Sequence, residues 1–262
     1  MTSLRISLAQ MPIEAGNLPR NISTFKKHVQ EAAAREAKLV VFPELWSTGY
    51  ALDHANDFAD ELNRGLFQQI ATEATENKIA IVGTTLEKRG MSIHNSMSFF
   101  APNGRSLGVY RKMHLIRLLN EDKYLTPGNA PLTAKLPWGV TGFAICYDLR
   151  FPEVFRRYTV QEGAMMVIIS AEWPIERIEH WRSLLIARAI ENQCYMVAVN
   201  TAGKSGNHVF GGHSMIVDPL GKIVAEAGEQ PQHLTVDIDL DIVATVRKNL
   251  PFLDDYRIDI YN

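Results

Sequence analysis

The sequence is poor in cysteine, in net charge and in long hydrophobic runs, and each shortage excludes a class of protein. Only two of its 262 residues are cysteines, so a disulfide framework is excluded and a reducing compartment is expected. A net charge of -2 provides no basic surface for nucleic acid or anionic lipid. No apolar run approaches the roughly 18 residues of a membrane span, and the N-terminal apolar stretch is too short for a secretory signal. We therefore expect a soluble, cytoplasmic protein without nucleic-acid or membrane partners.

Short β-rich runs alternate with helical patterns along the chain. Apolar residues at helical spacing predict helices over 21–37, 61–78, 152–163 and 175–193. Short apolar or alternating runs predict strands over 4–10, 38–44, 79–88, 95–102, 106–112, 139–148, 164–170, 194–200 and 234–240, and a hairpin over 213–227. No long polar linker divides the chain, which predicts one α/β domain over 1–262. The two halves share strand–helix–strand layers, which favours two packed sheets with helices outside but leaves the strand order open.

Three of the predicted strands end in a charged or nucleophilic residue. "LVVFPE" ends at Glu44, "LGVYRK" ends at Lys112, and "GFAIC" ends at Cys146. Side chains at the carboxyl ends of strands line the crevice where α/β proteins bind ligands. Taken singly, the glutamate is typical of a solvated turn, the lysine of a surface and the cysteine of a packed core. Together they are the three residue types that a thiol hydrolase needs.

The chemistry explains why these three types belong together. A free thiol carries too little thiolate at neutral pH unless a base or a cation assists it. A buried carboxylate can serve as that base, and a lysine can stabilise the oxyanion that forms when the thiol attacks a carbonyl. Histidine is an alternative base, but the eight histidines lie mostly in loop-like or helical stretches. No papain-like signature surrounds either cysteine.

Three longer segments resemble the signature motifs of a known family. "VVFPELWSTGY" (40–50), "GVYRKMHL" (108–115) and "ICYDLRFPE" (145–153) are similar, in this order, to those of the nitrilase superfamily of carbon–nitrogen hydrolases. "IARAIENQCYMVAVN" (186–200) and "GGHSMIVDPLGKIV" (211–224) resemble the helix, strand and late hairpin that follow, so the resemblance covers nearly the whole chain. It implies a four-layer αββα sandwich.

The resemblance also implies a role for each strand-end residue. Glu44 is expected as general base, Lys112 as the cation that stabilises the tetrahedral intermediate, and Cys146 as nucleophile. The backbone N–H of Tyr147 is expected to complete the oxyanion hole. No metal or organic cofactor is implied.

A second glutamate often joins the site in this family, in a loop before a Pro-Gly turn. "NEDKYLTPG" (120–128) offers Glu121 at the matching place, with Asp122 as the alternative. Glu121 is expected to hold Lys112 and to position the substrate amide. A solvated loop acid is the competing interpretation.

The segment after the cysteine is expected to form a strained turn, so that the sulfur of Cys146 faces a pocket. Asp148, Arg150 and Glu153 are expected to support this turn from behind. Pro152 suits the first turn of the next helix, whose positive N-terminal end is expected to favour a thiolate nearby.

The residues around the nucleophile restrict the range of candidate substrates. "CYDLRFPE" resembles the amidase branch that includes ω-amidases, which act on 2-oxoglutaramate or 2-oxosuccinamate, and "AEWP" (171–174) and "HW" (180–181) resemble segments of its bacterial members. Aliphatic nitrilases are expected to carry Cys-Trp-Glu, so Tyr147 and Asp148 disfavour a nitrile. Hydrolysis of an N-carbamoyl amine or another small amide is an alternative. A non-catalytic binding or assembly member is a further alternative, which the presence of all three strand-end groups disfavours.

Several residues are expected to line the substrate pocket. Glu172, Trp173 and Trp46 are the candidates, while core packing for Trp173 and a turn position for Glu172 are the alternatives. A substrate carboxylate would need an arginine or a lysine, and Arg150 and Arg182 both qualify, so this choice stays open.

Other conspicuous residues are assigned no chemistry. His208 and His213 lack a third ligand at metal-like spacing, so we expect a loop residue and a structural hydrogen-bonder. Cys194 is expected to be inert core, and 237–243 to be an exposed edge that leads into the last helix. By resemblance, a homodimer or higher homo-oligomer is expected, paired through the helices at 152–163 and 175–193.

Overall fold

Alternating apolar residues build a first sheet that is buried on both faces. The computed structural model describes residues 3–261. Along β1, Leu4, Ile6 and Leu8 face a core between two sheets, whereas Ala9 joins a second core under helices. β2 alternates in the same way, because its middle residue Val40 faces the helices and its neighbours face the opposite sheet. The sheet has the order β14-β1-β2-β3-β4-β5, with bounds β1 Ser3–Gln10, β2 Leu39–Val41, β3 Ala80–Arg89, β4 Ser92–Phe100, β5 Ser106–Arg111 and β14 Gln232–Asp239.

The second sheet is centred on three parallel strands, β7, β8 and β9. Its order is β13-β12-β9-β8-β7-β6, with bounds β6 Thr133–Leu136, β7 Gly139–Ile145, β8 Met166–Ala171, β9 Tyr195–Asn200, β12 Met215–Val217 and β13 Ile223–Glu226. β10 (Ala202–Ser205) and β11 (His208–Gly211) form a separate small ribbon. The described residues of β8 and β9 are buried throughout, as expected for central parallel strands covered on both faces.

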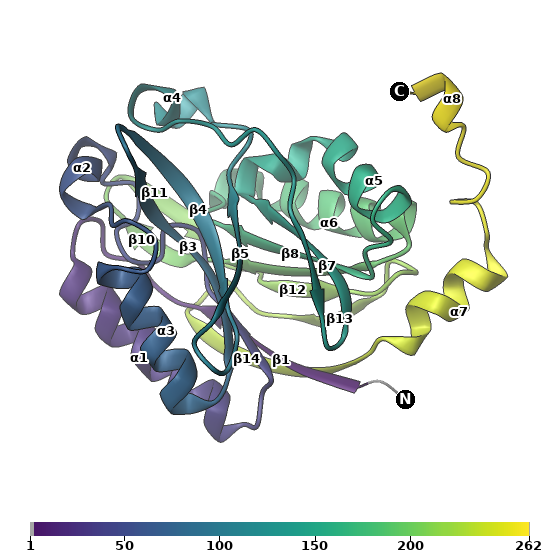
Figure 1. Ribbon diagram of the computed structural model, residues 1–262, viewed down its shortest axis with the longest axis horizontal. Helices are drawn as coiled ribbons and strands as arrows, with labels where there is room; N and C mark the ends of the chain where they lie inside the picture. The colour runs from purple at the N-terminus through teal and green to yellow at the C-terminus, as the bar shows by residue number, and fades with distance from the viewer. Residues whose placement is uncertain (1–2, 262) are drawn as a thin grey trace.

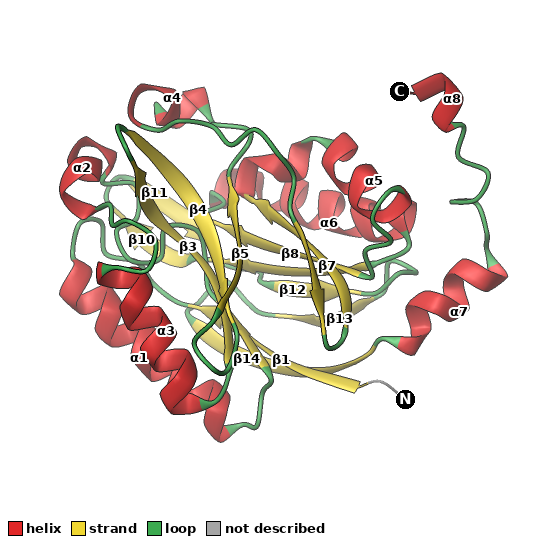
Figure 2. Cartoon of the chain, viewed as in Figure 1, coloured by secondary structure: helices red, strands yellow, loops and turns green. Residues whose placement is uncertain are grey.

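Helices cover the outer face of each sheet (Figures 1 and 2). α1 and α3 pack on the first sheet, and α5 and α6 pack on the second. The helix bounds are α1 Leu18–Ala34, α2 Ala55–Phe58, α3 Gly65–Asn77, α4 Glu121–Tyr124, α5 Pro152–Val160, α6 Ile178–Asn192, α7 Asp241–Asn249 and α8 Ile258–Tyr261. Short 3₁₀ turns lie at Leu52–His54, Arg117–Leu119, Cys146–Arg150 and Ile175–Arg177. The predicted four-layer αββα sandwich is confirmed.

The chain ends occupy different places in this sandwich. β14 is an edge strand of the first sheet, as predicted for the acidic stretch 237–243, and it leads into α7. α7 packs its buried Val243 on the core between the sheets, whereas α8 lies apart from the sheets (Figure 1, yellow). Between residues 3 and 261, no helix combines the length and the apolar character needed to cross a membrane.

Two predicted strands end three residues earlier than expected, and each early end has a local cause. The strand predicted over 38–44 pairs only as far as Val41, shortly before Pro43, which has no backbone N–H to donate. The strand predicted over 139–148 ends at Ile145, because Cys146 has a φ of +43° and begins a 3₁₀ turn. Glu44 and Cys146 therefore lie in irregular backbone just after the ends of these two strands.

Candidate active site

The ends of three strands from the two sheets bring their charged and nucleophilic side chains together. Glu44 follows β2 and Lys112 follows β5 in the first sheet, whereas Cys146 follows β7 in the second. Lys112 Nζ lies 2.7 Å from Glu44 Oε1. The Cys146 thiol donates to the backbone carbonyl of Glu172, with Sγ and the oxygen 4.0 Å apart, and the charges of Glu44 and Lys112 both act on it. The three residues whose roles were predicted at strand ends therefore form one buried cluster.

Lys112 is held between two carboxylates. Its Nζ donates to Glu44 Oε1 and to Glu121 Oε1, each at 2.7 Å, and none of the three side chains is exposed. Burial opposes the ammonium charge, but the carboxylates of Glu44 and Glu121 outweigh it and raise the pKa of Lys112. Lys112 is therefore a fixed cation at the centre of the site.

Glu121 is the second carboxylate of the cluster, and Asp122 is exposed. The Ile116 N–H donates to Glu121 Oε2 at 2.7 Å, and the Tyr50 hydroxyl donates to Oε1 at 3.0 Å. Burial raises the pKa of Glu121, and Lys112 opposes this shift. The structure thus places Glu121, and not Asp122, against the lysine.

Glu44 accepts further hydrogen bonds from groups that are remote in the sequence. The Asn95 side-chain amide donates to its Oε1 at 2.8 Å, and the backbone N–H of Glu172 donates to its Oε2 at 3.0 Å. Both partners fix the direction of the carboxylate inside the core. The sequence analysis missed Asn95 and Tyr50. The only available signal was that Tyr50 closes the "WSTGY" end of the first motif.

Cys146 occupies a strained backbone position, as predicted for the turn. Its φ of +43° is rare for a residue with a side chain, and the residue is 5% exposed. Burial raises the pKa of the thiol well above its usual value, the negative charge of Glu44 raises it further, and Lys112 opposes both. The thiol is therefore protonated at rest and needs a base.

This protonation state corrects the expectation that the next helix favours a thiolate. The 3₁₀ turn Cys146–Arg150 separates the sulfur from α5, which begins at Pro152. The influence of a helix terminus falls off within its first turn, so burial and the charge of Glu44 dominate.

Asp148 braces the turn from behind, as predicted. Its carboxylate accepts from the Tyr110 hydroxyl at 2.7 Å and from the Ile145 N–H at 3.0 Å. It also accepts from the His114 N–H at 3.1 Å, and His114 Nδ1 lies 2.7 Å away. Asp148 thereby ties the segment after Lys112 to the segment around Cys146.

The other two residues expected behind the turn lie elsewhere. Glu153 is exposed on the first turn of α5. The guanidinium of Arg150 lies 4.7 Å over the ring of Trp173 and faces a cavity instead. Glu153 is solvated and Arg150 faces the cavity, so of the three residues only the buried Asp148 supports the turn.

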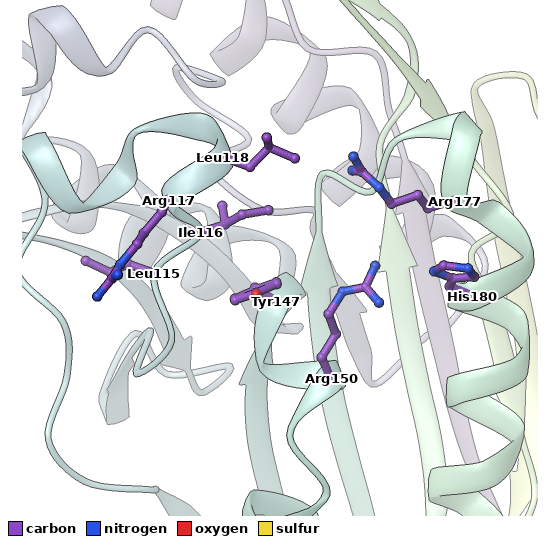
Figure 3. A pocket seen from close by; sticks show the side chains of 8 residues that line it. All are labelled: Leu115, Ile116, Arg117, Leu118, Tyr147, Arg150, Arg177 and His180. Carbon is purple, nitrogen blue, oxygen red and sulfur yellow. The ribbon is translucent and has the colours of Figure 1, made fainter.

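A cavity of about 660 Å³ opens beside the nucleophile's turn (Figure 3). Tyr147 lies on one side of it, and Arg150, Arg177 and His180 point into it from the other. Two guanidinium groups and an imidazole facing one space suit an anionic ligand. The sequence analysis quoted His180 only as part of the "HW" pair and gave it no role, and it did not single out Arg177.

A second cavity, of about 300 Å³, includes Glu172 and Tyr50 in its wall. Leu118, in the loop that precedes Glu121, lines both cavities. Glu172 is 1% exposed, and among residues 3–261 neither of its carboxylate oxygens has a hydrogen-bond partner. Burial, followed by the nearby Glu44, raises the pKa of Glu172 well above its usual value. Glu172 is therefore a neutral acid in the wall of the site.

The two tryptophans expected in the pocket lie in the core. Trp46 is 1% exposed and stacks on Phe25 of α1 at 4.2 Å, on the helix side of the first sheet. Gly83 permits this packing, because a Cβ there would lie 3.1 Å from the Trp46 ring. Trp173 is 2% exposed, and its Nε1 donates to the Arg177 carbonyl at 2.8 Å. Trp46 thus departs from the prediction, and Trp173 adopts its core alternative while supporting the cavity's arginines.

The remaining residues singled out in the sequence are placed as follows. Arg182 forms a two-armed ion pair with Glu226, at 2.7 and 3.0 Å, which leaves Arg150 as the better of the two predicted arginines. His213 is a structural hydrogen-bonder, since its Nδ1 lies 2.7 Å from the same carboxylate. His208 is exposed on β11, a strand and not the expected loop. Cys194 is fully buried.

Comparisons with known proteins agree with this arrangement. The family model described as carbon–nitrogen hydrolase matches residues 5–248. The chain is 38% identical over 257 residues to a 2-oxoglutaramate amidase of Bacillus subtilis, covering 98% of each chain.

Two solved structures share the fold over most of their length. A CN-hydrolase superfamily protein of Xanthomonas campestris, solved with an arsenic adduct in its active site, has a TM-score of 0.91 at 30% identity, covering 98% of each chain. A mutant amidase from Nesterenkonia sp. AN1, solved after addition of acrylamide to its active-site cysteine, has a TM-score of 0.85 at 25% identity, covering 95% of this chain and 98% of that one. The chain therefore belongs to the carbon–nitrogen hydrolase family of the nitrilase superfamily, and it is an enzyme of that family.

Proposed function

We propose that this enzyme is an ω-amidase that hydrolyses the terminal amide of small 2-oxo acids such as 2-oxoglutaramate and 2-oxosuccinamate. The observation that carries the proposal is the cavity beside Tyr147, into which Arg150, Arg177 and His180 point. These groups suit the carboxylate at the far end of such a substrate. The name of the Bacillus subtilis relative supports the same substrate.

The first half of the reaction forms a thioester. Glu44 takes the proton of the Cys146 thiol, and the sulfur attacks the amide carbon. Lys112 Nζ and the Tyr147 backbone N–H stabilise the oxyanion of the tetrahedral intermediate. The carbon–nitrogen bond then breaks, and the proton held by Glu44 passes to the leaving ammonia. The high pKa of the buried thiol explains why a base is needed for this step.

The second half releases the acid. Glu44 takes a proton from a water molecule that attacks the thioester carbon, and the same oxyanion donors act again. The carbon–sulfur bond breaks, and the proton returns to the sulfur of Cys146. Glu121 keeps Lys112 in place during both halves, since it holds the ammonium at 2.7 Å.

Glu172 contributes a neutral donor to the wall of the site. Because burial keeps its carboxyl group protonated, it can donate a hydrogen bond to a carbonyl oxygen of the substrate. The acceptor can be the oxygen of the amide carbonyl or that of the 2-oxo group. Its unpartnered oxygens support a contact with substrate.

The substrate test is ammonia release from 2-oxoglutaramate and from the uncharged butyramide, for the parent enzyme and for Arg177→Met and Arg150→Met. We expect each variant to raise KM for 2-oxoglutaramate by about 10- to 100-fold, because each removes a charge-assisted hydrogen bond. Turnover of butyramide should change little. Arg182→Met is the matched control, because its guanidinium is paired with Glu226.

Two results would contradict the proposal. Equal losses on both substrates would mean that the arginines do not recognise the carboxylate. Preferred hydrolysis of N-carbamoylputrescine, a cation, would favour the N-carbamoyl-amine alternative, because two guanidinium groups disfavour a cationic ligand.

The assembly that best fits the surface is a homodimer through α5 and α6. Ile190 of α6 is 45% exposed, and Leu184 and Ile186 on the same helix are only partly buried. Sedimentation at micromolar concentration should give a dimer or a larger oligomer, and a monomer would contradict this. A single catalytic domain over 1–262 and a cytoplasmic location also belong to the proposal, and the two free cysteines accord with a reducing compartment.

A further inference from the structure

A cluster of metal-ligating side chains lies outside the active site, between the first helix and the last strand. His28 and Glu31 are three residues apart on α1, so they share one face of the helix. His233 comes from β14, the edge strand that pairs with β1 beneath that helix, 205 residues away from His28 in the chain. The three residues are brought together only by the fold.

The potential ligand atoms already converge. The two Nδ1 atoms of His28 and His233 are 2.9 Å apart, and His233 Nδ1 lies 3.8 Å from Glu31 Oε2. All three ligand atoms lie within 4.8 Å of one another. Two imidazole nitrogens around a tetrahedral zinc ion, at bonds of about 2.0–2.1 Å, are about 3.3 Å apart. The imidazoles therefore need to separate by only a few tenths of an ångström to admit an ion.

The surrounding residues orient the three side chains and leave the cluster accessible to an ion from solvent. Two Nδ1 atoms can face each other this closely only if one bears a proton and the other offers its lone pair. Arg35 Nη2 holds the other oxygen of Glu31 at 2.5 Å, as outer partners hold ligating carboxylates elsewhere. The His233 side chain is 4% exposed and that of Glu31 is 41% exposed, so an ion can enter from solvent on the glutamate side. The cation Arg35 opposes binding and argues for a moderate affinity.

We propose that His28, Glu31 and His233 bind one divalent transition-metal ion of the zinc type, with water in the fourth position. Two imidazoles and a carboxylate are the donor set of zinc and cobalt rather than of calcium or magnesium. The ion clamps α1 to the edge strand β14, so it stabilises the fold and takes no part in catalysis. Its site is independent of the proposed amidase activity.

The test is a Co²⁺ titration of the full-length protein after treatment with EDTA, followed by visible absorption. We expect saturable one-to-one binding with the intense bands of tetrahedral cobalt, and displacement of the cobalt by Zn²⁺. Glu31→Gln and His28→Gln should each weaken binding at least tenfold, and Glu31→Gln changes a partly exposed side chain that the fold can spare. His208→Gln is the matched control and should bind like the parent.

A thermal melt gives a second reading. At a hundredfold excess of Zn²⁺ over the parent's Kd, the melting temperature of the parent should rise by about 5–10 °C, and that of Glu31→Gln by no more than about half as much. Binding that survives in both cluster variants would overturn the proposal. A thiolate-to-cobalt band that persists in Glu31→Gln and disappears in Cys146→Ala would also overturn it, by locating the ion at the catalytic thiol.

Discussion

The two cysteines lie in similar places in the fold but in opposite surroundings. Cys146 follows β7 and Cys194 precedes β9, each at a junction between helix and strand, and both are buried. Burial raises the pKa of both thiols, that of Cys194 to about 12. The charges of Glu44 and Lys112 act on the thiol of Cys146, whereas those of Arg247, Arg156 and Glu191 act on that of Cys194. A buried thiol is therefore inert by default, and the partner that can take its proton makes the difference.

The largest expected difference is in catalysis. Cys146→Ala removes the nucleophile and should lower kcat/KM for 2-oxoglutaramate by at least about 10³-fold. Cys194→Ala should leave kcat/KM close to the parent value, because none of the catalytic side chains acts on its sulfur. Steady-state ammonia release measures kcat/KM of both variants. Equal losses would contradict the assignment of Cys146, and not Cys194, as the nucleophile.

A second difference concerns the neighbouring cations. Lys112→Met should lower kcat by about 10²–10³-fold, because an oxyanion donor is lost. Two cations act on Cys194, and the one with the larger effect is Arg247, whose guanidinium donates to the backbone carbonyls of Gln193 and Ala164. Arg247→Met should therefore reduce stability and leave kcat of the folded enzyme unchanged. A fall in kcat similar to that of Lys112→Met would refute the assigned role of the lysine.

The pH dependence of alkylation tests where the proton of Cys146 goes. In the parent, Glu44 takes this proton, so no net proton is lost and the rate of reaction with iodoacetamide should be flat between pH 7 and 9. In Glu44→Gln the proton must go to solvent. Burial, the largest cause of the raised thiol pKa, remains in this variant, so the rate should then increase by up to about tenfold per pH unit over this range. Rates measured by mass spectrometry for the two proteins decide this, and identical slopes would exclude Glu44 as the base.

The smallest effect is on stability, and its sign should differ between the two positions. Cys146 has a positive φ, so Cys146→Gly should be about 1 kcal/mol more stable than Cys146→Ala. Cys194 does not share this backbone conformation, so Cys194→Gly should be less stable than Cys194→Ala by about 0.5–1 kcal/mol. Urea denaturation of the four variants measures both differences. If the Gly variant were less stable than the Ala variant at both positions, the backbone at Cys146 would not be strained.

The sequence was informative wherever the signal was local. The alternation in 4–10 predicted a strand with two different faces, and β1 has them. The apolar runs that stop at Glu44, Lys112 and Cys146 predicted three groups at strand ends, and the structure brings these groups together. The motif resemblance placed Glu121 against Lys112.

The sequence did not predict contacts between segments that are far apart in the chain. Asn95 donates to Glu44 across 51 residues, and Asp148 links to Tyr110 across 38, and neither pairing leaves a periodic trace. Trp46 was expected in the pocket, yet it packs on the helix side of the first sheet against Phe25.

By itself, the sequence indicated two packed sheets with helices outside and the residue types at the strand ends, because periodicity and turn chemistry are properties of neighbouring residues. The four-layer αββα sandwich was implied by the motif resemblance. The tertiary structure alone decided which arginine faces the cavity, which acid is neutral and which histidines meet. These depend on burial and on distances between segments far apart in the chain. Burial raises the pKa of Glu172 and of Cys146, and the fold sets Arg177 beside Arg150 while Glu226 engages Arg182.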